Sequence, residues 1–207
     1  VLLKGRFPSL PRLTYTLGYM YDAGAEEWRF RQTGLMFDVP ELAGDLFIGR
    51  TKEDFSTNKL MVGYHGWTME RSTASDAFLP ILADGVKWTS RLAGGALVYN
   101  LGWFNDTRTE SESFNKNDNQ FAARAVWLPF RGGDDGKLLH LALQYRYGEA
   151  DDGQLRYRSR PESFPAQTYA IDTGAFPAHH SNTLGVEAYY RPGPLMFGIW
   201  RVSGAFS

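Results

Sequence analysis

Residues 137–147 read Lys-Leu-Leu-His-Leu-Ala-Leu-Gln-Tyr-Arg-Tyr. From Leu139 to Tyr147 every odd position is a leucine or a tyrosine, and the positions between them include His140 and Arg146. Side chains alternate between the two faces of a β-strand, so this segment has one apolar and one polar face when it is extended. A helix would instead repeat its apolar positions every three or four residues. The stretch therefore predicts a β-strand.

The same alternation recurs along the chain, and the helical period appears nowhere for long. Together the segments predict about nine strands of about 8–12 residues, longer than the roughly 5–6 residues usual in soluble sheets. The other segments with this period are 12–22, 28–37, 45–52, 84–92, 95–105, 119–128, 182–191 and 194–203. The fold class that they predict is all-β.

Two all-β architectures fit alternating strands. A soluble sandwich turns the apolar face inward, whereas a transmembrane β-barrel turns it outward and keeps a polar interior. Strand length favours the barrel, as do the aromatic residues near many strand ends. Ala123 and Ala125 lie on the apolar face, where they would leave voids in a sandwich core but would be tolerated by lipid tails.

The connections between the predicted strands alternate in length, which also favours a barrel. Membrane barrels of the outer-membrane type have short turns at one end and longer loops at the other. The short connections are 38–44, 93–94, 131–136 and 191–194, and the long or polar ones are 22–27, 53–83, 106–118 and 149–181.

Composition excludes several other classes. The 207 residues carry a formal charge of −1 and no cysteine, so there is no basic balance for nucleic acid, no disulfide and no thiolate metal site. His179 and His180 point to opposite faces of an extended chain, so a metal site with Asp172 is not expected. We find no motif for an enzyme and expect no cofactor.

Basic residues fall on the polar faces of the predicted strands, whereas acidic residues collect in the connections. If these faces line a lumen, the lumen attracts anions; the alternative is an ordinary sheet whose arginines face solvent. The basic residues are Arg12, Arg29, Arg31, Arg50, Lys52, Lys87, Arg91, Arg124, Arg146 and Arg191, and Glu187 is the acid that opposes them within a strand.

Arg156, Arg158 and Arg160 alternate with other residues in a long connection. In an extended chain, side chains two residues apart lie about 6.6 Å from one another on one face. Three guanidinium groups in file could pass an oxyanion along. The alternative is an exposed hairpin, paired with Asp151 and Asp152, and the spacing alone leaves both open.

The connection from Glu53 to Ala83 is long for a segment without structure of its own, and such loops are usually functional. Because it contains several apolar residues, we expect it to fold into the barrel and narrow the pore. Arg71 should then lie towards the constriction, with Glu70 paired to an arginine of the wall.

Several motifs follow one another along the chain: Gly49–Phe55, Met69–Ser72, Asp84–Val86, Arg156–Glu162, Asp172–Gly174, Glu187 and Gly193–Pro194. Their order resembles that in the phosphate-selective porin O and P family of Gram-negative outer membranes. The resemblance covers about positions 12 to 203, with Thr51 standing where the family has an aromatic residue.

The resemblance implies a sixteen-stranded, antiparallel transmembrane β-barrel, usually a homotrimer, with loops in its lumen and an arginine-lined anion path. Residues 1–207 would then be a single β-barrel domain, incomplete at both ends, with about nine of those strands. The implied function is passive diffusion of small anions, phosphate or polyphosphate included, through the outer membrane. The expected partners are outer-membrane lipid and lipopolysaccharide. The alternative function is a soluble β-sandwich module that binds an acidic ligand.

The candidate site combines the residues from the charge pattern with those of the constriction loop. The candidate anion-binding residues are Arg156, Arg158, Arg160, Arg71, Arg50, Lys52, Lys87, Arg91, Arg124 and Arg146. The candidate constriction-loop residues are Met69, Glu70 and Arg71.

Overall fold

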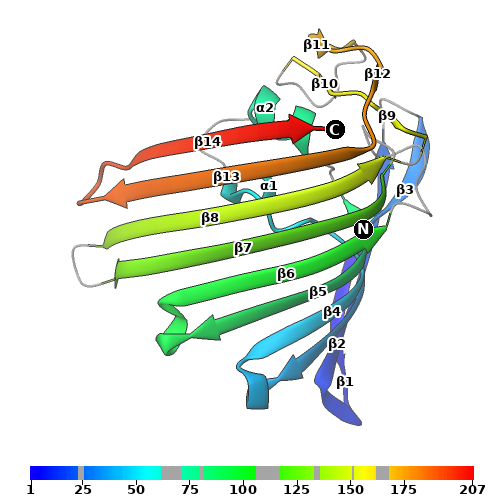
Figure 1. The fold of residues 1–207 in the computed structure, drawn as a ribbon. Helices are drawn as coiled ribbons and strands as arrows, with labels where there is room; N and C mark the ends of the chain where they lie inside the picture. The colour runs from blue at the N-terminus through cyan, green and yellow to red at the C-terminus, as the bar shows by residue number, and fades with distance from the viewer. Residues whose placement is uncertain are drawn as a thin grey trace.

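The computed structural model describes residues 1–22, 26–61, 71–79, 82–105, 117–132, 136–150, 152–161 and 168–207. Within these residues, ten strands form one antiparallel sheet in which nearly every strand pairs with the next one along the chain (Figure 1). Its strands are β1 Leu2–Phe7, β2 Leu10–Asp22, β3 Glu27–Val39, β4 Gly44–Thr51, β5 Ala83–Leu92, β6 Leu97–Asn105, β7 Asn117–Gly132, β8 Lys137–Ala150, β13 His180–Arg191 and β14 Phe197–Phe206.

All nine predicted strands are present, and the soluble β-sandwich is wrong because these strands form one sheet rather than two packed sheets. β1 was not predicted from the sequence. Gly5 lies on the apolar face of β1, where a large apolar side chain would be expected. The ring of Tyr15 in β2 occupies the space that a side chain at Gly5 would need. The alternation is therefore hidden in the sequence of β1.

The sheet is strongly curved, and the segment after β4 lies on its concave side (Figure 1). That segment includes α1 Thr57–Leu60, and α2 Thr73–Phe78 precedes β5. None of the described helices is long and apolar enough to cross a membrane. Short 3-10 turns, η1 Pro40–Leu42 and η3 Ala93–Gly95, join β3 to β4 and β5 to β6.

The long connection after β8 contains two small strand pairs that the sequence analysis did not predict. β9 Gln154–Leu155 pairs with β12 Phe176–Pro177, and β10 Arg158–Ser159 pairs with β11 Ile171–Asp172. These pairs stand beyond one end of the sheet (Figure 1).

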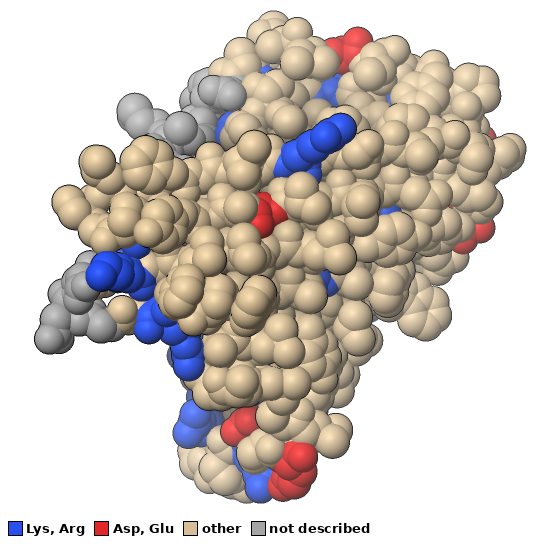
Figure 2. Space-filling view, turned by 60° about the vertical axis from the view of Figure 1, so that its left-hand side comes forward, with Lys and Arg blue, Asp and Glu red and all other residues tan. Residues whose placement is uncertain are grey.

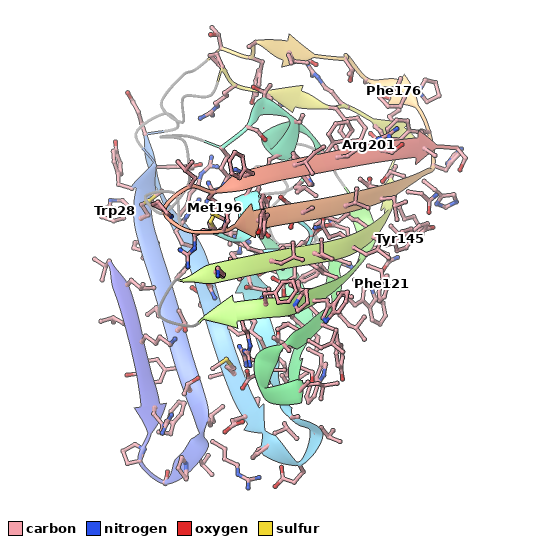
Figure 3. The ribbon with its side chains drawn as sticks, turned by 90° about the vertical axis from the view of Figure 1, so that its left-hand side faces the viewer. Trp28, Phe121, Tyr145, Phe176, Met196 and Arg201 are labelled. Carbon is pink, nitrogen blue, oxygen red and sulfur yellow. The ribbon has the colours of Figure 1, made fainter. Side chains whose placement is uncertain are left out.

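The two faces of the sheet are as the alternation predicts. Large apolar side chains are exposed on the convex face, for example Trp103 at 66% and Leu143 at 55%. Figure 2 shows a surface that is mostly uncharged, with most of its basic and acidic side chains along the left and lower margins. In Figure 3, Trp28 on one side and Phe121 and Tyr145 on the other project away from the space around which the sheet curves.

Three glycines lie side by side across neighbouring strands, where Gly34 pairs with Gly49 and Gly49 pairs with Gly85. A Cβ atom at any of them would lie 2.1–2.4 Å from a carbonyl oxygen of an adjacent strand. Gly49 also has a φ of +135°, which side-chain-bearing residues rarely adopt. The close curvature of β3, β4 and β5 thus depends on residues without side chains.

Candidate functional site

The chain that leaves β4 folds back over the concave face of the sheet. Residues 53–57 contact β5, β7, β8 and β13 through polar side chains, and Phe55 and Ser56 are fully buried. The expectation that this connection folds inward is therefore met for its first residues, 53–57. Met69 and Glu70 lie outside the described residues.

Glu53 forms a buried ion pair with Arg146 of β8. Arg146 Nε donates to Glu53 Oε2 at 2.6 Å, and Arg146 Nη2 donates to the amide oxygen Oε1 of Gln120 at 3.0 Å. Both partners of the ion pair are 2% exposed. The glutamate of this loop that was predicted to pair with an arginine of the wall is Glu70, and the contact of Glu53 was not predicted.

Glu187 of β13 binds the start of helix α1. Its carboxylate accepts a hydrogen bond from the Thr57 amide at 2.8 Å and another from the Thr57 hydroxyl at 2.6 Å. Arg124 of β7 donates to the same carboxylate at 2.9 Å and to the Thr57 hydroxyl at 2.5 Å. His140 Nε2 lies 3.7 Å from Glu187 Oε2.

Phe55 occupies a space on the wall between these two contacts. Its ring would be 3.0 Å from a Cβ atom placed on Gly185 of β13. Gly185 pairs with Gln144 of β8, whose side chain is also buried. The missing side chain at Gly185 thus allows an aromatic residue of the loop to lie against the strand.

A group of cations surrounds Lys52, and we call Lys52, Lys59, Arg71, Arg31 and Lys87 the cation group. Lys52 Nζ donates to the carbonyl oxygens of Leu60 and Met61 at 3.1 and 2.9 Å, and Arg71 Nη2 donates to the Met61 oxygen at 3.1 Å. Two cations from different parts of the loop therefore meet at one acceptor.

Burial and like charge both act on the Lys52 ammonium. Burial first, and then the positive charges of Arg71, Lys59, Arg31 and Lys87, together lower its pKa to about 8. Asp54 lies 3.3 Å from Lys87 Nζ. Burial raises the pKa of Asp54, and the Lys87 charge opposes this effect.

Arg158 lies in β10, and Arg156 and Arg160 lie shortly before and directly after that strand. They share one side of their segment, while Tyr157 and Ser159 on the other side are buried and Tyr157 packs on Phe78 at the end of α2. Arg156 Nε donates to Asp172 at 2.8 Å, and this bond, together with one from the Gly174 amide, lowers the pKa of Asp172 to about 2. Arg158 lies over the ring of Tyr169. Asp172 was not predicted as a partner of Arg156, and Asp151, one of the two expected partners, lies outside the described residues.

Arg50 and Arg91 form ion pairs with acids of neighbouring strands. Arg50 pairs with Asp84 of β5 at 2.9 Å and donates to the Phe30 carbonyl, and Arg91 pairs with Asp45 at the turn end of the sheet. The contacts of Glu53, Asp54, Thr57 and Lys59 were not predicted. Two signals in the sequence pointed to this segment: the Gly49–Phe55 motif, which includes Glu53 and Asp54, and the length of the connection that begins at Glu53.

The histidines make other contacts. The ring nitrogen Nδ1 of His180 lies 2.8 Å from the Tyr147 hydroxyl, and the rings of His179 and His180 are 6.4 Å apart. In the part of the chain that the structure describes, no group of three or more histidine and acidic side chains could hold a metal ion.

Long antiparallel strands with an exposed apolar face and a polar concave face define an outer-membrane β-barrel protein. The family model for phosphate-selective porin O and P matches residues 12–198, and the chain belongs to that family. It is thus an integral outer-membrane protein of an anion-selective porin family and not an enzyme. A comparison with curated proteins finds no match.

Proposed function

We propose that small anions, phosphate or polyphosphate among them, diffuse passively along the concave side of the sheet past the cation group. The observation that supports this most directly is the meeting of Lys52 and Arg71 at the Met61 carbonyl. Lys87 of the wall and Lys59 of α1 add positive charge close enough to affect the Lys52 pKa. An anion near these side chains would relieve their mutual repulsion.

Passage requires that an anion bind weakly enough to leave again. The carboxylate of Asp54 beside Lys87 reduces the net positive charge of the group. A unit charge about 8 Å from an anion contributes roughly 2 kcal/mol at an effective dielectric constant of about 20. Several such cations with one acid give attraction without a single deep binding site.

We also propose that Arg156, Arg158 and Arg160 belong to the outer part of this path. Their common side in an extended segment beyond the end of the sheet supports this role. Arg50, Arg91, Arg124 and Arg146 retain their predicted place along the pore wall, and Met69 and Glu70 their predicted place in the constriction loop. A homotrimer, contact with lipopolysaccharide and a single domain over residues 1–207 complete the proposal.

The test is the anion preference of the full-length protein in planar bilayers, measured as the reversal potential in a salt gradient. Lys52→Gln combined with Arg71→Gln should reduce the anion-to-cation permeability ratio by about tenfold, which corresponds to roughly 1.4 kcal/mol. The reduction should persist at about 1 M salt, where the Debye length is only about 3 Å.

Arg191→Gln is the matched control, because Arg191 is exposed at a turn and donates to the Gly136 carbonyl. This variant should keep the reversal potential of the wild type. An unchanged potential in the Lys52 and Arg71 double variant would contradict the proposed path.

A further inference from the structure

Two wall arginines of the candidate site are bonded to the loop that crosses the concave face. We propose that Glu53–Arg146 and Thr57–Glu187–Arg124 form a two-point clamp that holds residues 53–57 on the wall. Arg146, Arg124 and Glu187 are then positioning residues, which act on a passing anion only through the loop. The effect on permeation rests on the proposed function, whereas the clamp itself rests on the contacts.

The first point of the clamp fixes the loop directly after Lys52. Arg146 reaches Glu53 through Nε at 2.6 Å and Nη2 at 3.4 Å, and Gln120 of β7 accepts a further bond from Nη2. The ion pair is almost completely buried. A carboxylate so placed holds the guanidinium in a single orientation, because its two oxygens match two donors of the fork.

The second point fixes the start of α1. Glu187 receives the amide and the hydroxyl of Thr57 on its two oxygens, so it takes the place of an N-terminal cap supplied by the wall. The Ser56 side chain at the N-cap position makes no capping bond of its own. The beginning of α1 is therefore stabilised by a residue 130 positions away in the sequence.

The clamp lies between two members of the cation group. Lys52 precedes Glu53 directly, and Lys59 follows Thr57 by two positions within α1. Lys52 also donates to the carbonyl oxygens at the end of α1, so its side chain joins the beginning and the end of the segment 52–61. Asp54 within this segment also pairs with Lys87 of β5 at 3.3 Å. Release of either point of the clamp would therefore let Lys52 and Lys59 shift about this remaining contact, relative to Lys87.

Removal of one partner is expected to have a large effect. A buried charge without its partner is strongly unfavourable, and the loop can relieve this by leaving the wall. Glu53→Gln and Glu187→Gln should each raise the population of the displaced loop by about 100-fold or more. The matched control is Glu41→Gln, since Glu41 forms an exposed ion pair with Arg12 at 2.6 Å.

The displaced loop is measured in two ways on the full-length protein. Because this chain has no cysteine, Asn58→Cys can be introduced for a spin label on α1, and its mobility followed by electron paramagnetic resonance. Single-channel recordings give the current noise and brief conductance steps. Both should increase in Glu53→Gln and Glu187→Gln, and neither should change in Glu41→Gln.

Two further variants test the clamp if Glu53→Gln or Glu187→Gln does not assemble. Thr57→Val removes the hydroxyl from Glu187 and Arg124 but leaves every charge in place, so it should assemble and give a smaller increase of the same kind. Exchange of the first pair, Glu53→Arg with Arg146→Glu, should restore low label mobility. Wild-type mobility and noise in Thr57→Val and Glu187→Gln together would overturn the clamp.

The label mobility separates this inference from the proposed function. If the protein conducts anions by another path, the label on α1 still becomes mobile when the clamp is broken. If the clamp is wrong, the reversal potential still depends on Lys52 and Arg71.

Discussion

At the scale of single residues, Lys52 should make the anion preference depend on pH. Its pKa of about 8 is far below that of an ordinary lysine, which is about 10.4. The charged form therefore predominates at pH 7 and is lost as the pH rises through 8. The anion-to-cation permeability ratio should fall between pH 7 and pH 9. Reversal potentials across this range provide the measurement.

Lys52→Arg is the control for this pH dependence, because a guanidinium stays charged throughout the range. That variant should keep a nearly constant ratio from pH 7 to pH 9, and Lys52→Gln should have a low ratio at every pH. An identical pH profile in wild type and Lys52→Arg would show that another group titrates.

The sequence predicted some of these residues and not their partners. Lys52, Lys87 and Arg71 were predicted because they are cations on polar strand faces or in a long loop. The loop residues that bind Arg146 and Arg124 were not predicted. Glu53 lies 93 positions from Arg146 in the sequence, and Thr57 lies 67 positions from Arg124. Periodicity describes a residue's own strand and carries no information about which loop folds onto it.

At the scale of the strands, the glycine row in β3, β4 and β5 should be intolerant of side chains. A methyl group at Gly85 would lie 2.1 Å from the Trp103 carbonyl and 2.7 Å from the Phe104 backbone. Backbone atoms cannot move aside as a side chain can, so Gly85→Ala should lower the yield of folded protein and its unfolding temperature. Thermal unfolding in detergent is the measurement.

Gly193→Ala is the matched control for Gly85→Ala, since nothing lies within 4 Å of a Cβ atom at Gly193, in the turn before β14. Equal unfolding temperatures for the two variants would contradict a role for the row in the curvature. The sequence showed these glycines but not their alignment, because the register between strands depends on the turns that join them.

At the scale of the whole molecule, the orientation of the two faces was predictable from the sequence. The polar positions of β7 and β8 are buried and the apolar positions are exposed, which is the reverse of a soluble sheet. Alternation predicts this orientation because side chains in a strand point to the two faces in turn. Once one residue is placed on a face, the face of every other residue in that strand follows. For the loop over the concave face, the sequence predicted that it folds inward but not which residues of the wall it contacts.

The face assignment can be tested at two adjacent positions of β2. Leu17 is 40% exposed and lies on the apolar face, whereas Thr16 next to it lies on the opposite face and pairs with Lys4 of β1. A charged residue in the lipid near the middle of the membrane costs roughly 2–4 kcal/mol. Leu17→Arg should therefore reduce assembly into the outer membrane, and Thr16→Arg should not, because its guanidinium would reach the polar side. The measurement is the fraction of heat-modifiable, protease-resistant protein in isolated outer membranes. Equal assembly of the two variants would mean that the convex face does not contact lipid at this strand, and the orientation of the whole sheet would have to be reversed.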